Sequence, residues 1–456
     1  MMMHLHILGL SGTFMSALAL LARDAGYKVT GSDANCYPPI SDLLRAKGIS
    51  WTEGYEDATL ALQADLVIIG NAIKRGMPVL EAVLESGKKN YVSGPQWLAE
   101  HILSKYKVIA VAGTHGKTTT TSMIAWILDQ AGLNPGFLIG GVATDFNTSS
   151  FLGKGEWFVI EADEYDSAFF DKRPKFMHYC PQIAVLNNLE FDHADIYADL
   201  AAIQQQFHYL LRTIPHSGVA IKPRDDKALN EVLSWGEYCQ IQETTLSGDA
   251  QWSAELLDES GSSFKVMYLG KEVAQVHWSL IGRFNIENAL AAIAASFNAG
   301  VNPEVAAKAL EHFTPVKRRL EVKSDKHGIT VYDDFAHHPT AITKTVDALR
   351  RSKRHQRIFA VMEFASYTMR TGVHAGEMAH ALAPVDGAYI LDPKDFNLQE
   401  TLSQWTCPYK VCNNHDEIVA EVTKNVREGD AVLVMSNRGF NGIHQQLIHS
   451  IDKRFA

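Results

Sequence analysis

Short runs of consecutive apolar residues recur along the chain, and segments with a helical period separate them. Val108–Ala112 and Ile183–Leu186 are unbroken apolar runs, which is typical of strands buried on both faces of a parallel sheet. The segment Met123–Leu128 instead repeats its apolar residues every three or four positions, as a packed helix does. Because this alternation of strand and helix continues through most of the chain, it predicts an α/β fold with mainly parallel sheets.

The pattern divides the chain into three units, which agrees with a length of 456 residues. Residues 1–106 open with strand, glycine turn, helix and strand, so we expect a Rossmann-like N-terminal domain. Residues 107–312 contain a phosphate loop and predict a central P-loop domain with a mainly parallel sheet. Alternation begins again near Phe313-Thr-Pro315, and residues 313–456 predict a doubly wound α/β domain.

The segment Gly113-Thr-His-Gly-Lys-Thr118 lies between a buried strand and a helix. This is the context in which a phosphate-binding loop forms, with main-chain N–H groups pointing at the phosphates. Lys117 would reach the β- and γ-phosphates, and the Thr118 hydroxyl would bind Mg²⁺. Val111 stands where the usual motif has a glycine, so the loop belongs to a shorter subclass. The alternative is a glycine turn that caps a helix by chance.

Two further strand ends carry candidate metal ligands. Glu161-Ala-Asp-Glu-Tyr-Asp166 follows an apolar strand, and its carboxylates could hold a divalent cation opposite the phosphate loop. A solvated acidic turn is the alternative. His193 also follows a strand and lies between Asp192 and Asp195, so we interpret it as a metal ligand, although a lone histidine is usually structural.

Three strand ends of the first domain could hold a diphosphate and a ribose or base. The glycine fingerprint of a dinucleotide site is incomplete, because Met15 stands at its third glycine. A tight turn without a ligand is therefore the alternative. The candidate contacts are Gly9, Ser11, Gly12, Ser32, Asp33 and Asn71.

Asn285 and Asn288 lie three residues apart at the start of an alanine-rich helix. They share one face of that helix and could offer paired amide groups to a purine edge. Helix capping would explain Asn285, but not both residues.

The composition of the chain limits the classes of partner that the protein can bind. A formal charge of −10 argues against nucleic acid and against an anionic membrane surface. No stretch is apolar for long enough to span a bilayer, so we expect no membrane insertion. The five scattered cysteines indicate reduced thiols, and Met3–Ala22 lacks the positive start of a secretory signal. These features predict a cytoplasmic protein with small-molecule substrates.

Together these motifs resemble the Mur ligase family along the whole chain. The phosphate loop, Glu161-Ala-Asp-Glu, the segment from Asn188 to His193 and Asn285-x-x-Asn288 are similar to the family's motifs in order. The segments Arg319-Leu-Glu and Asp334-Phe-Ala-His-His-Pro are similar to those that close over ATP. Phe284 departs from the histidine that the family often has there.

The resemblance implies an amide ligase that uses ATP and Mg²⁺. It implies that Lys117, His193, Arg319 and Asp334 are catalytic, and that Thr118, Glu161 and His193 hold the metal. His337 or His338 are candidates for the base that takes a proton from the amine. The implied ATP contacts are Gly113, Thr114, His115, Gly116, Lys117, Thr118, Thr119, Asn285, Asn288, Arg319 and Asp334.

Finer features favour one substrate. No lysine lies between Lys175 and Lys222, where several relatives place a carbamylated lysine, and this resembles members that act directly on UDP-N-acetylmuramate. The segments Ile69–Ile73, Ser93–Trp97 and Ser436–His444 are similar to the member that attaches a murein tripeptide, L-alanyl-γ-D-glutamyl-meso-diaminopimelate. The member that adds L-alanine is the alternative.

Arg370 and Arg438 follow strands of the third unit, and their guanidinium groups would suit the carboxylates of a tripeptide. Either arginine could instead be a solvated surface residue. Two other classes share some of the motifs. A mechanical P-loop ATPase would not need the first domain, and a UDP-sugar sensor would not need Lys117 or Glu161.

Overall fold

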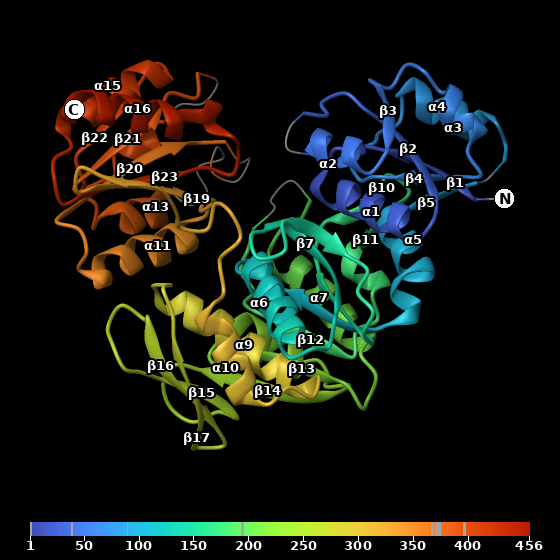
Figure 1. The fold of residues 1–456 in the computed structure, drawn as a ribbon, viewed down its shortest axis with the longest axis horizontal. Coiled ribbons are helices and arrows are strands. Elements are labelled where there is room, and N and C mark those ends of the chain that lie inside the picture. Colours follow the sequence, from blue (N-terminus) through green and yellow to red (C-terminus); the bar gives the residue numbers. More distant parts are fainter. Residues whose placement is uncertain are drawn as a thin grey trace.

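The structure is a computed structural model, and it describes residues 2–37, 40–88, 90–192, 196–365, 369, 375–394 and 398–456. Three lobes are visible, each built on its own main sheet (Figure 1). The N-terminal and C-terminal lobes lie on opposite sides of the central one. The predicted three-domain α/β fold is confirmed.

The N-terminal lobe has a parallel five-stranded sheet in the order β3-β2-β1-β4-β5. Its strands are β1 (His4–Leu8), β2 (Lys28–Asp33), β3 (Ser50–Glu53), β4 (Leu66–Ile69) and β5 (Tyr91–Ser93). Its helices are α1 (Thr13–Asp24), α2 (Ile40–Ala46), α3 (Thr59–Gln63), α4 (Pro78–Glu85), α5 (Gly94–His101) and the 3₁₀ helix η1 (Leu103–Lys105). The strand order reverses between β1 and β4, and parallel α/β sheets bind ligands at such a point.

His6 lies fully buried in β1 of this lobe. Its Nδ1 is 2.8 Å from Thr30 Oγ1 and its Nε2 is 3.0 Å from Ser32 Oγ, so both ring nitrogens have a hydroxyl partner. Burial, assisted by the neighbouring His4, lowers the pKa of His6 to about 4. The ring is therefore neutral in the folded lobe at neutral pH.

We expect the N-terminal lobe to lose stability as the pH falls from about 6.5 to about 4. In this window the unfolded chain protonates His6 and the folded lobe does not, so acid favours unfolding. The loss should approach about 2–3 kcal/mol near pH 4. Urea unfolding at each pH, monitored through the hydrogen exchange of β1 amides, measures this loss of stability. His6→Gln should flatten the pH dependence, leaving only the smaller contribution of His4, and an unchanged slope would contradict the assignment.

The central lobe has a ten-stranded sheet in the order β17-β16-β15-β14-β13-β12-β6-β9-β7-β8. Its strands are β6 (Lys107–Ala112), β7 (Gly136–Ala143), β8 (Thr148–Phe151), β9 (Trp157–Glu161), β12 (Ile183–Leu186), β13 (Val219–Pro223), β14 (Gln240–Thr245), β15 (Trp252–Leu256), β16 (Ser263–Tyr268) and β17 (Lys271–His277). A separate hairpin pairs β10 (Asp166–Ala168) with β11 (Asp171–Pro174). Pairing is parallel from β15 to β7, and antiparallel in β15-β16-β17 and β7-β8.

Five α-helices and one 3₁₀ helix complete the described part of the central lobe. They are α6 (Lys117–Gln130), η2 (Lys175–His178), α7 (Leu200–Arg212), α8 (Lys227–Ser234), α9 (Arg283–Asn298) and α10 (Pro303–Glu311). Helix α6, which starts at the phosphate loop, packs against α9 and α10. The start of α9 is thereby fixed beside the start of α6.

The C-terminal lobe has a six-stranded sheet in the order β18-β19-β23-β20-β21-β22, with only β18 antiparallel among its described strands. Its strands are β18 (Glu321–Lys326), β19 (Ile329–Asp334), β20 (Arg357–Glu363), β21 (Gly387–Leu391), β22 (Tyr409–Cys412) and β23 (Asp430–Met435). Its helices are α11 (Pro339–Ser352), α13 (Ala375–Leu382), α14 (Gln399–Leu402), α15 (His415–Asn425), η3 (Phe440–Gly442) and α16 (Ile443–Phe455). Helices α11 and α13 contribute to one apolar cluster, and α15 and α16 to another. This lobe is doubly wound, as predicted.

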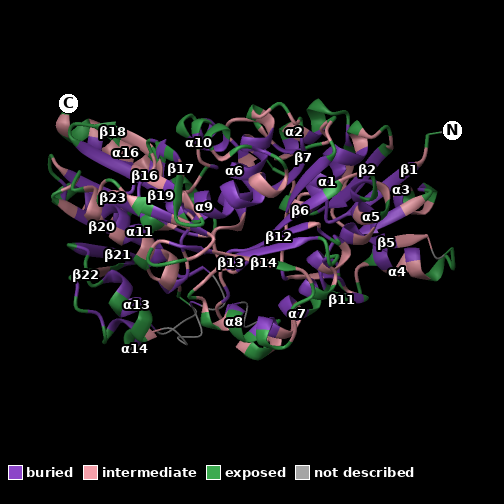
Figure 2. Cartoon of the chain, turned by 90° about the horizontal axis from the view of Figure 1, so that it is seen from below, coloured by how far each residue is buried: buried purple, intermediate pink, exposed green. Residues whose placement is uncertain are grey.

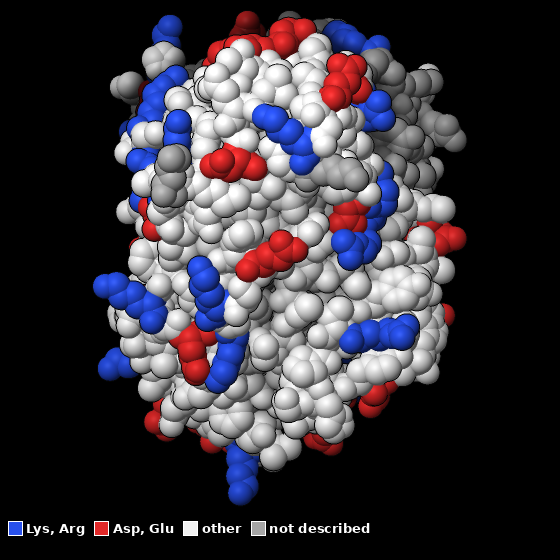
Figure 3. All heavy atoms as spheres, turned by 90° about the vertical axis from the view of Figure 1, so that its right-hand side faces the viewer, with Lys and Arg blue, Asp and Glu red and all other residues white. Residues whose placement is uncertain are grey.

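Burial follows the predicted pattern, because the central strands are buried and the outer faces of the helices are exposed (Figure 2). Positive and negative side chains are interspersed on the face that carries the N-terminal lobe, without a patch of one sign (Figure 3). Among the described residues, no helix has the length and hydropathy needed to cross a membrane.

Candidate active site

A cavity of about 800 Å³ is lined by residues from all three lobes. This volume lies in the range of small-molecule sites. The N-terminal lobe contributes residues of α1 and α2, the central lobe contributes the phosphate loop and the start of α9, and the C-terminal lobe contributes residues 334–338. The linker residues 315–319 also line it.

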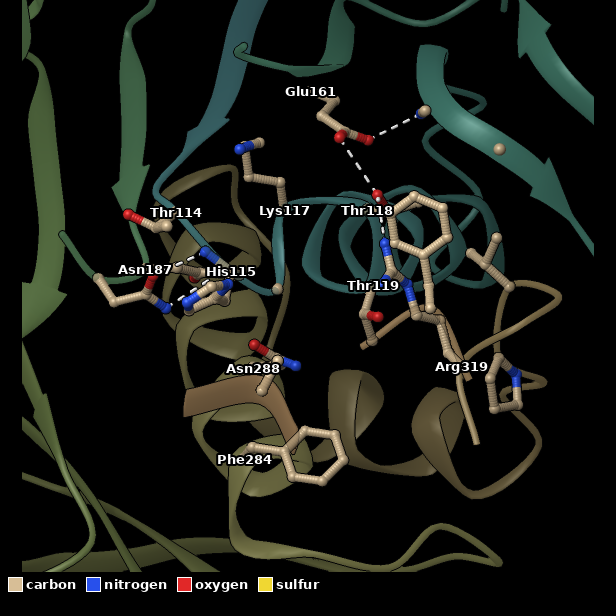
Figure 4. A pocket seen from close by; sticks show the side chains of 18 of the residues that line it. Thr114, His115, Lys117, Thr118, Thr119, Glu161, Asn187, Phe284, Asn288 and Arg319 are labelled. Atoms are coloured by element: carbon tan, nitrogen blue, oxygen red, sulfur yellow. Dashed lines mark hydrogen bonds between the residues drawn. The ribbon is translucent and has the colours of Figure 1, made fainter. Parts of the chain in front are cut away.

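The strand order brings the predicted motifs of the central lobe together. Strand β6 pairs with β9 on one side and β12 on the other, and all three strands are parallel. Their carboxyl ends therefore meet at one edge of the sheet. The phosphate loop after β6, Glu161 at the end of β9 and Asn187 after β12 consequently face the same cavity (Figure 4).

The phosphate loop has a fixed, tight conformation. Gly116 has a φ of +81°, and a Cβ at this position would lie only 2.6 Å from Asn288 Oδ1. Only glycine fits here without strain. The N–H of His115 donates to Asn188 Oδ1 at 2.7 Å, and Asn188 Nδ2 donates back to the His115 carbonyl at 3.0 Å. The segment after β12 thus holds the loop in shape.

Lys117 lies at the first position of α6 and points to the acidic turn. Its Nζ donates to the Gly113 carbonyl at 2.6 Å and lies 3.0 Å from Glu164 Oε2. Burial alone would lower the pKa of Lys117, but the carboxylates of Glu164, Asp163 and Glu161 raise it above its ordinary value. The ammonium group is therefore charged, and a phosphate at this loop would compete with Glu164 for it.

Thr118 and Glu161 form an oxygen-rich corner beside the loop. Thr118 Oγ1 donates to Glu161 Oε1 at 3.2 Å, and the Gly140 N–H donates to Glu161 Oε2 at 2.8 Å. A Cβ at Gly140 would lie 2.4 Å from that oxygen, so glycine provides the space for the carboxylate. Burial raises the pKa of Glu161, although Lys117 and the Gly140 N–H oppose the shift.

A hydroxyl and a carboxylate are the ligand types that Mg²⁺ prefers. The Thr118–Glu161 pair therefore fits that ion. The third predicted ligand, His193, lies outside the described residues.

Two predicted residues reach the site from the C-terminal lobe. Arg319 Nη2 lies 3.4 Å from Thr118 Oγ1, and its guanidinium is 4.9 Å from the centroid of the Phe335 ring. Burial lowers the pKa of Arg319, while Asp334 and Glu161 oppose the shift. We had expected closure to bring Arg319 to the nucleotide site, and in this structure the contact with the phosphate loop is already made.

Asp334 supports the loop that carries Arg319. Its Oδ2 accepts the N–H of Leu320 at 2.6 Å and its Oδ1 accepts the N–H of Ala336 at 2.8 Å. Burial raises its pKa, with Arg319 opposing. Both carboxylate oxygens are thus engaged by the main chain.

Helix α9 forms the opposite wall. Asn285 and Asn288 both line the cavity, but their local partners differ. Asn285 Nδ2 donates to the Ile281 carbonyl at 2.8 Å, but the N-cap of α9 is Gly282 without a side-chain cap hydrogen bond, so Asn285 does not cap the helix. Asn288 extends towards the phosphate loop, and the Phe284 ring lies farther from that loop (Figure 4).

The six candidate residues of the first domain lie at its sheet edge, and none of them is among the described residues that line the cavity. Asp33 Oδ2 accepts the Ser11 N–H at 2.8 Å, so the glycine turn is closed by the protein's own carboxylate. The Ser32 hydroxyl is buried against His6 and is not accessible to a ligand in this structure. Gly12 and Asn71 are exposed.

The remaining candidates belong to the C-terminal lobe. Arg370 lies outside the described residues. Arg438 is exposed, and its N–H donates to Ser436 Oγ at 2.8 Å. His337 and His338 line the cavity, and burial lowers the pKa of His337.

Three residues that contact the predicted ones were missed by sequence reasoning, namely Gly140, Asn187 and Glu190. Glu164, one of the predicted acidic-turn carboxylates, forms an ion pair with Lys117. For Asn187 and Glu190 a signal existed, because both follow the apolar strand β12 at the sheet edge where ligands bind.

Comparisons with known proteins agree with this geometry. Residues 4–106 match the model of the Mur ligase family catalytic domain, residues 111–296 the Mur ligase middle domain, and residues 318–438 the Mur ligase glutamate ligase domain. The chain is 49% identical over 455 residues to the UDP-N-acetylmuramate–L-alanyl-γ-D-glutamyl-meso-2,6-diaminoheptandioate ligase of Escherichia coli (strain K12), covering 99% of each chain. The chain belongs to the Mur ligase family.

The chain is also similar to two other Mur ligases. The murein peptide ligase of Psychrobacter arcticus has a solved structure that superimposes with a TM-score of 0.75, at 45% identity over 98% of each chain. The UDP-N-acetylmuramate–L-alanine ligase of Desulforapulum autotrophicum is 35% identical over 395 residues, 85% of this chain and 83% of that relative. As a Mur ligase, the protein is an ATP-dependent amide ligase.

Proposed function

We propose that this Mur ligase joins the tripeptide L-alanyl-γ-D-glutamyl-meso-diaminopimelate to UDP-N-acetylmuramate, with conversion of ATP to ADP and phosphate. The observation that carries the substrate choice is the difference in identity, 49% over 99% of the chain to a tripeptide ligase against 35% over 85% to an L-alanine ligase. L-Alanine addition is the second candidate, because the motifs around the phosphate loop suit both reactions.

The chemistry follows from the poor reactivity of a carboxylate. Transfer of the γ-phosphoryl group to the lactyl carboxylate gives an acyl phosphate, and attack by the tripeptide amine then expels phosphate. Lys117 and Arg319 supply fixed positive charge where negative charge builds up during transfer. Because residues of all three lobes line the cavity, the lobes could shield the acyl phosphate from water when the substrates are bound.

We assign Mg²⁺ to the Thr118–Glu161 corner, together with His193. When bound, the ion would neutralise charge on the transferring phosphoryl group. Glu161 is oriented for this role by the Gly140 N–H and the Thr118 hydroxyl. Neutral His337, whose pKa is lowered by burial, is our candidate to take the proton of the amine.

The three lobes divide the substrates in this proposal. We place the UDP-sugar on residues 1–106, ATP on residues 107–312 and the tripeptide on residues 313–456. The parallel strand ends of each lobe support these assignments. The sugar-site residues are those of the N-terminal sheet edge, and the cytoplasm, which supplies ATP, is the proposed location.

For ADP formation by the purified enzyme, kcat/KM should be at least about tenfold higher with the tripeptide than with L-alanine. The reason is that L-alanine has one carboxylate and no side chain beyond a methyl, so it forgoes contacts that the tripeptide makes. Coupled ADP release with UDP-N-acetylmuramate and each amine measures this preference. Release should require both the sugar nucleotide and an amine.

Arg438→Ala tests the proposed peptide side of the site. We expect a higher KM for the tripeptide and an unchanged KM for ATP, since Arg438 is exposed on the loop after β23 and is not among the described residues that line the cavity with the phosphate loop. A wild-type preference for L-alanine would reject the tripeptide assignment. An unchanged tripeptide KM in Arg438→Ala would reject that residue alone.

A further inference from the structure

The phosphate loop is hydrogen-bonded to the main-chain groups of Glu190. Thr114 Oγ1 accepts the Glu190 N–H at 2.9 Å and donates to the Glu190 carbonyl at 3.3 Å. The Thr114 N–H donates to the Asn188 carbonyl at 3.2 Å. The loop and the segment from Asn188 to Glu190 therefore move as one unit.

The Glu190 side chain leaves this unit and crosses to the C-terminal lobe. Its Oε2 accepts the Thr340 hydroxyl at 2.7 Å, across 150 positions of sequence. The same oxygen is 3.6 Å from His338 Nδ1 and 3.5 Å from His115 Nε2. The rings of His115 and His338 face each other with centroids 4.9 Å apart. One carboxylate thus joins the phosphate loop to the first turn of α11.

The electrostatics of this contact favour an ionised carboxylate. Burial would raise the pKa of Glu190, but His115 and the Thr340 hydroxyl, with His338, hold it at about 2. A hydrogen bond to an ionised acceptor is stronger than one between neutral groups. The contact is half-buried, so solvent screens it less than an exposed pair.

We propose that Glu190 is a positioning residue that couples the phosphate loop to closure of the C-terminal lobe. A nucleotide bound to the loop would stabilise the segment that carries Glu190, and Glu190 in turn holds Thr340 and the start of α11. Closure in turn places Arg319 beside Thr118. This coupling is reciprocal, because a closed lobe must favour the nucleotide-bound loop by the same factor.

Other cross-lobe contacts are weaker candidates and offer a matched control. The ion pairs of Lys344 with Glu287, at 2.9 Å, and Lys353 with Glu259, at 2.7 Å, are exposed and should contribute little. Lys344 lines the cavity, whereas Lys353 caps the C-terminal end of α11 and is not among the described residues that line it. Removal of the Lys353 charge perturbs the same helix without touching Glu190.

A metal ion is the competing explanation for the cluster. His115, Glu190 and His338 each bring one ligand atom within 4.8 Å of the others. However, Thr340 already engages two of the three groups, since its hydroxyl donates to Glu190 and its N–H donates to His338 Nδ1 at 3.3 Å. The direct hydrogen-bonded contact accounts for these positions without an ion.

Small-angle X-ray scattering of the full chain, titrated with Mg²⁺ and a non-hydrolysable ATP analogue, tests the coupling. The wild type should become more compact, and Thr340→Val should need about tenfold more analogue for half of that change, within the usual range of coupling. Glu190→Gln should do the same, and the double variant should be no worse than either. Lys353→Met should behave as wild type, and Thr340→Ser should restore the response.

This readout does not depend on which amine is the substrate, although the catalytic consequence rests on the proposed function. With substrates, Thr340→Val should consume more ATP per amide formed, because an open lobe lets water reach the acyl phosphate. Additive effects of the two substitutions, or a wild-type response in both, would overturn the coupling. A wild-type response abolished by a zinc-selective chelator would overturn the direct contact in favour of a metal.

Discussion

Replacement of Lys117 by alanine is expected to lower kcat by about 10³-fold or more. Lys117 is the cation at the start of α6, with its Nζ 2.6 Å from the Gly113 carbonyl inside the phosphate loop. Its charge is secured by three neighbouring carboxylates that raise its pKa. Loss of this cation removes stabilisation that is strongest when negative charge moves between the phosphates and the acceptor.

Single-turnover ADP formation measures the effect on the chemical step. The affinity for UDP-N-acetylmuramate, measured by calorimetry, should stay near the wild-type value because we place that ligand on the first lobe. Lys344→Ala is the matched control, since it removes another lysine that lines the cavity. Thermal melting must accompany the assay, because Glu164 is buried beside Lys117 and would lose its cation. Near-normal turnover of a folded Lys117→Ala variant would reject the phosphate-loop assignment.

The strands that the sequence predicts best are those buried on both faces. Ile183–Leu186 was predicted as a strand with the same bounds as β12, and its four residues are 0–3% exposed. An apolar run of this kind favours a buried strand because it is too short for a helix and a turn follows it. The start of helix α1 at Thr13 is harder to predict, because Gly12 precedes it without a side-chain cap to mark it.

Strands β18 and β7 escaped prediction because charged residues or glycines interrupt their apolar pattern. Strand β18, Glu321–Lys326, contains four charged residues and lies at the edge of its sheet, so hydrophobic alternation is absent. Strand β7 has two consecutive glycines, which read as a turn, yet Gly140 is needed there to admit the Glu161 carboxylate. Local pattern cannot show such a requirement, since it arises from packing against another strand.

The site was predictable as far as its motifs are local. Lys117 and Thr118 follow from a strand, a turn and a helix, whereas Glu190 and Thr340 lie 150 positions apart and carry no shared pattern. Asp334 was predicted to contact ATP; it lines the cavity, and both of its oxygens also accept main-chain N–H groups. Only the folded chain shows which groups have other partners.

The linker between the central and C-terminal lobes contains two adjacent arginines with different partners. Arg319 points to the phosphate loop at Thr118. Arg318 has a left-handed backbone conformation, with φ +64°, and its Nη2 donates to the carbonyls of Ser436 and Arg438 at 2.6 Å each. The ring of Phe335 lies beside both guanidinium groups, 5.3 Å from Arg318 and 4.9 Å from Arg319. A substitution of one arginine can therefore serve as the control for a substitution of the other.

Arg319→Lys should lower kcat by about 10²-fold although the charge is kept. A lysine ammonium cannot stack on Phe335 or present two parallel donors, so it would not hold the position beside Thr118. The KM for the tripeptide should change little. Arg318→Lys should show the reverse, a tripeptide KM raised by about tenfold with a nearly normal kcat, because the loop after β23 loses its two carbonyl contacts. Steady-state kinetics with each substrate varied separately gives both values. If the two variants share one kinetic profile, the linker acts only as a tether, and the division of roles between these arginines is wrong.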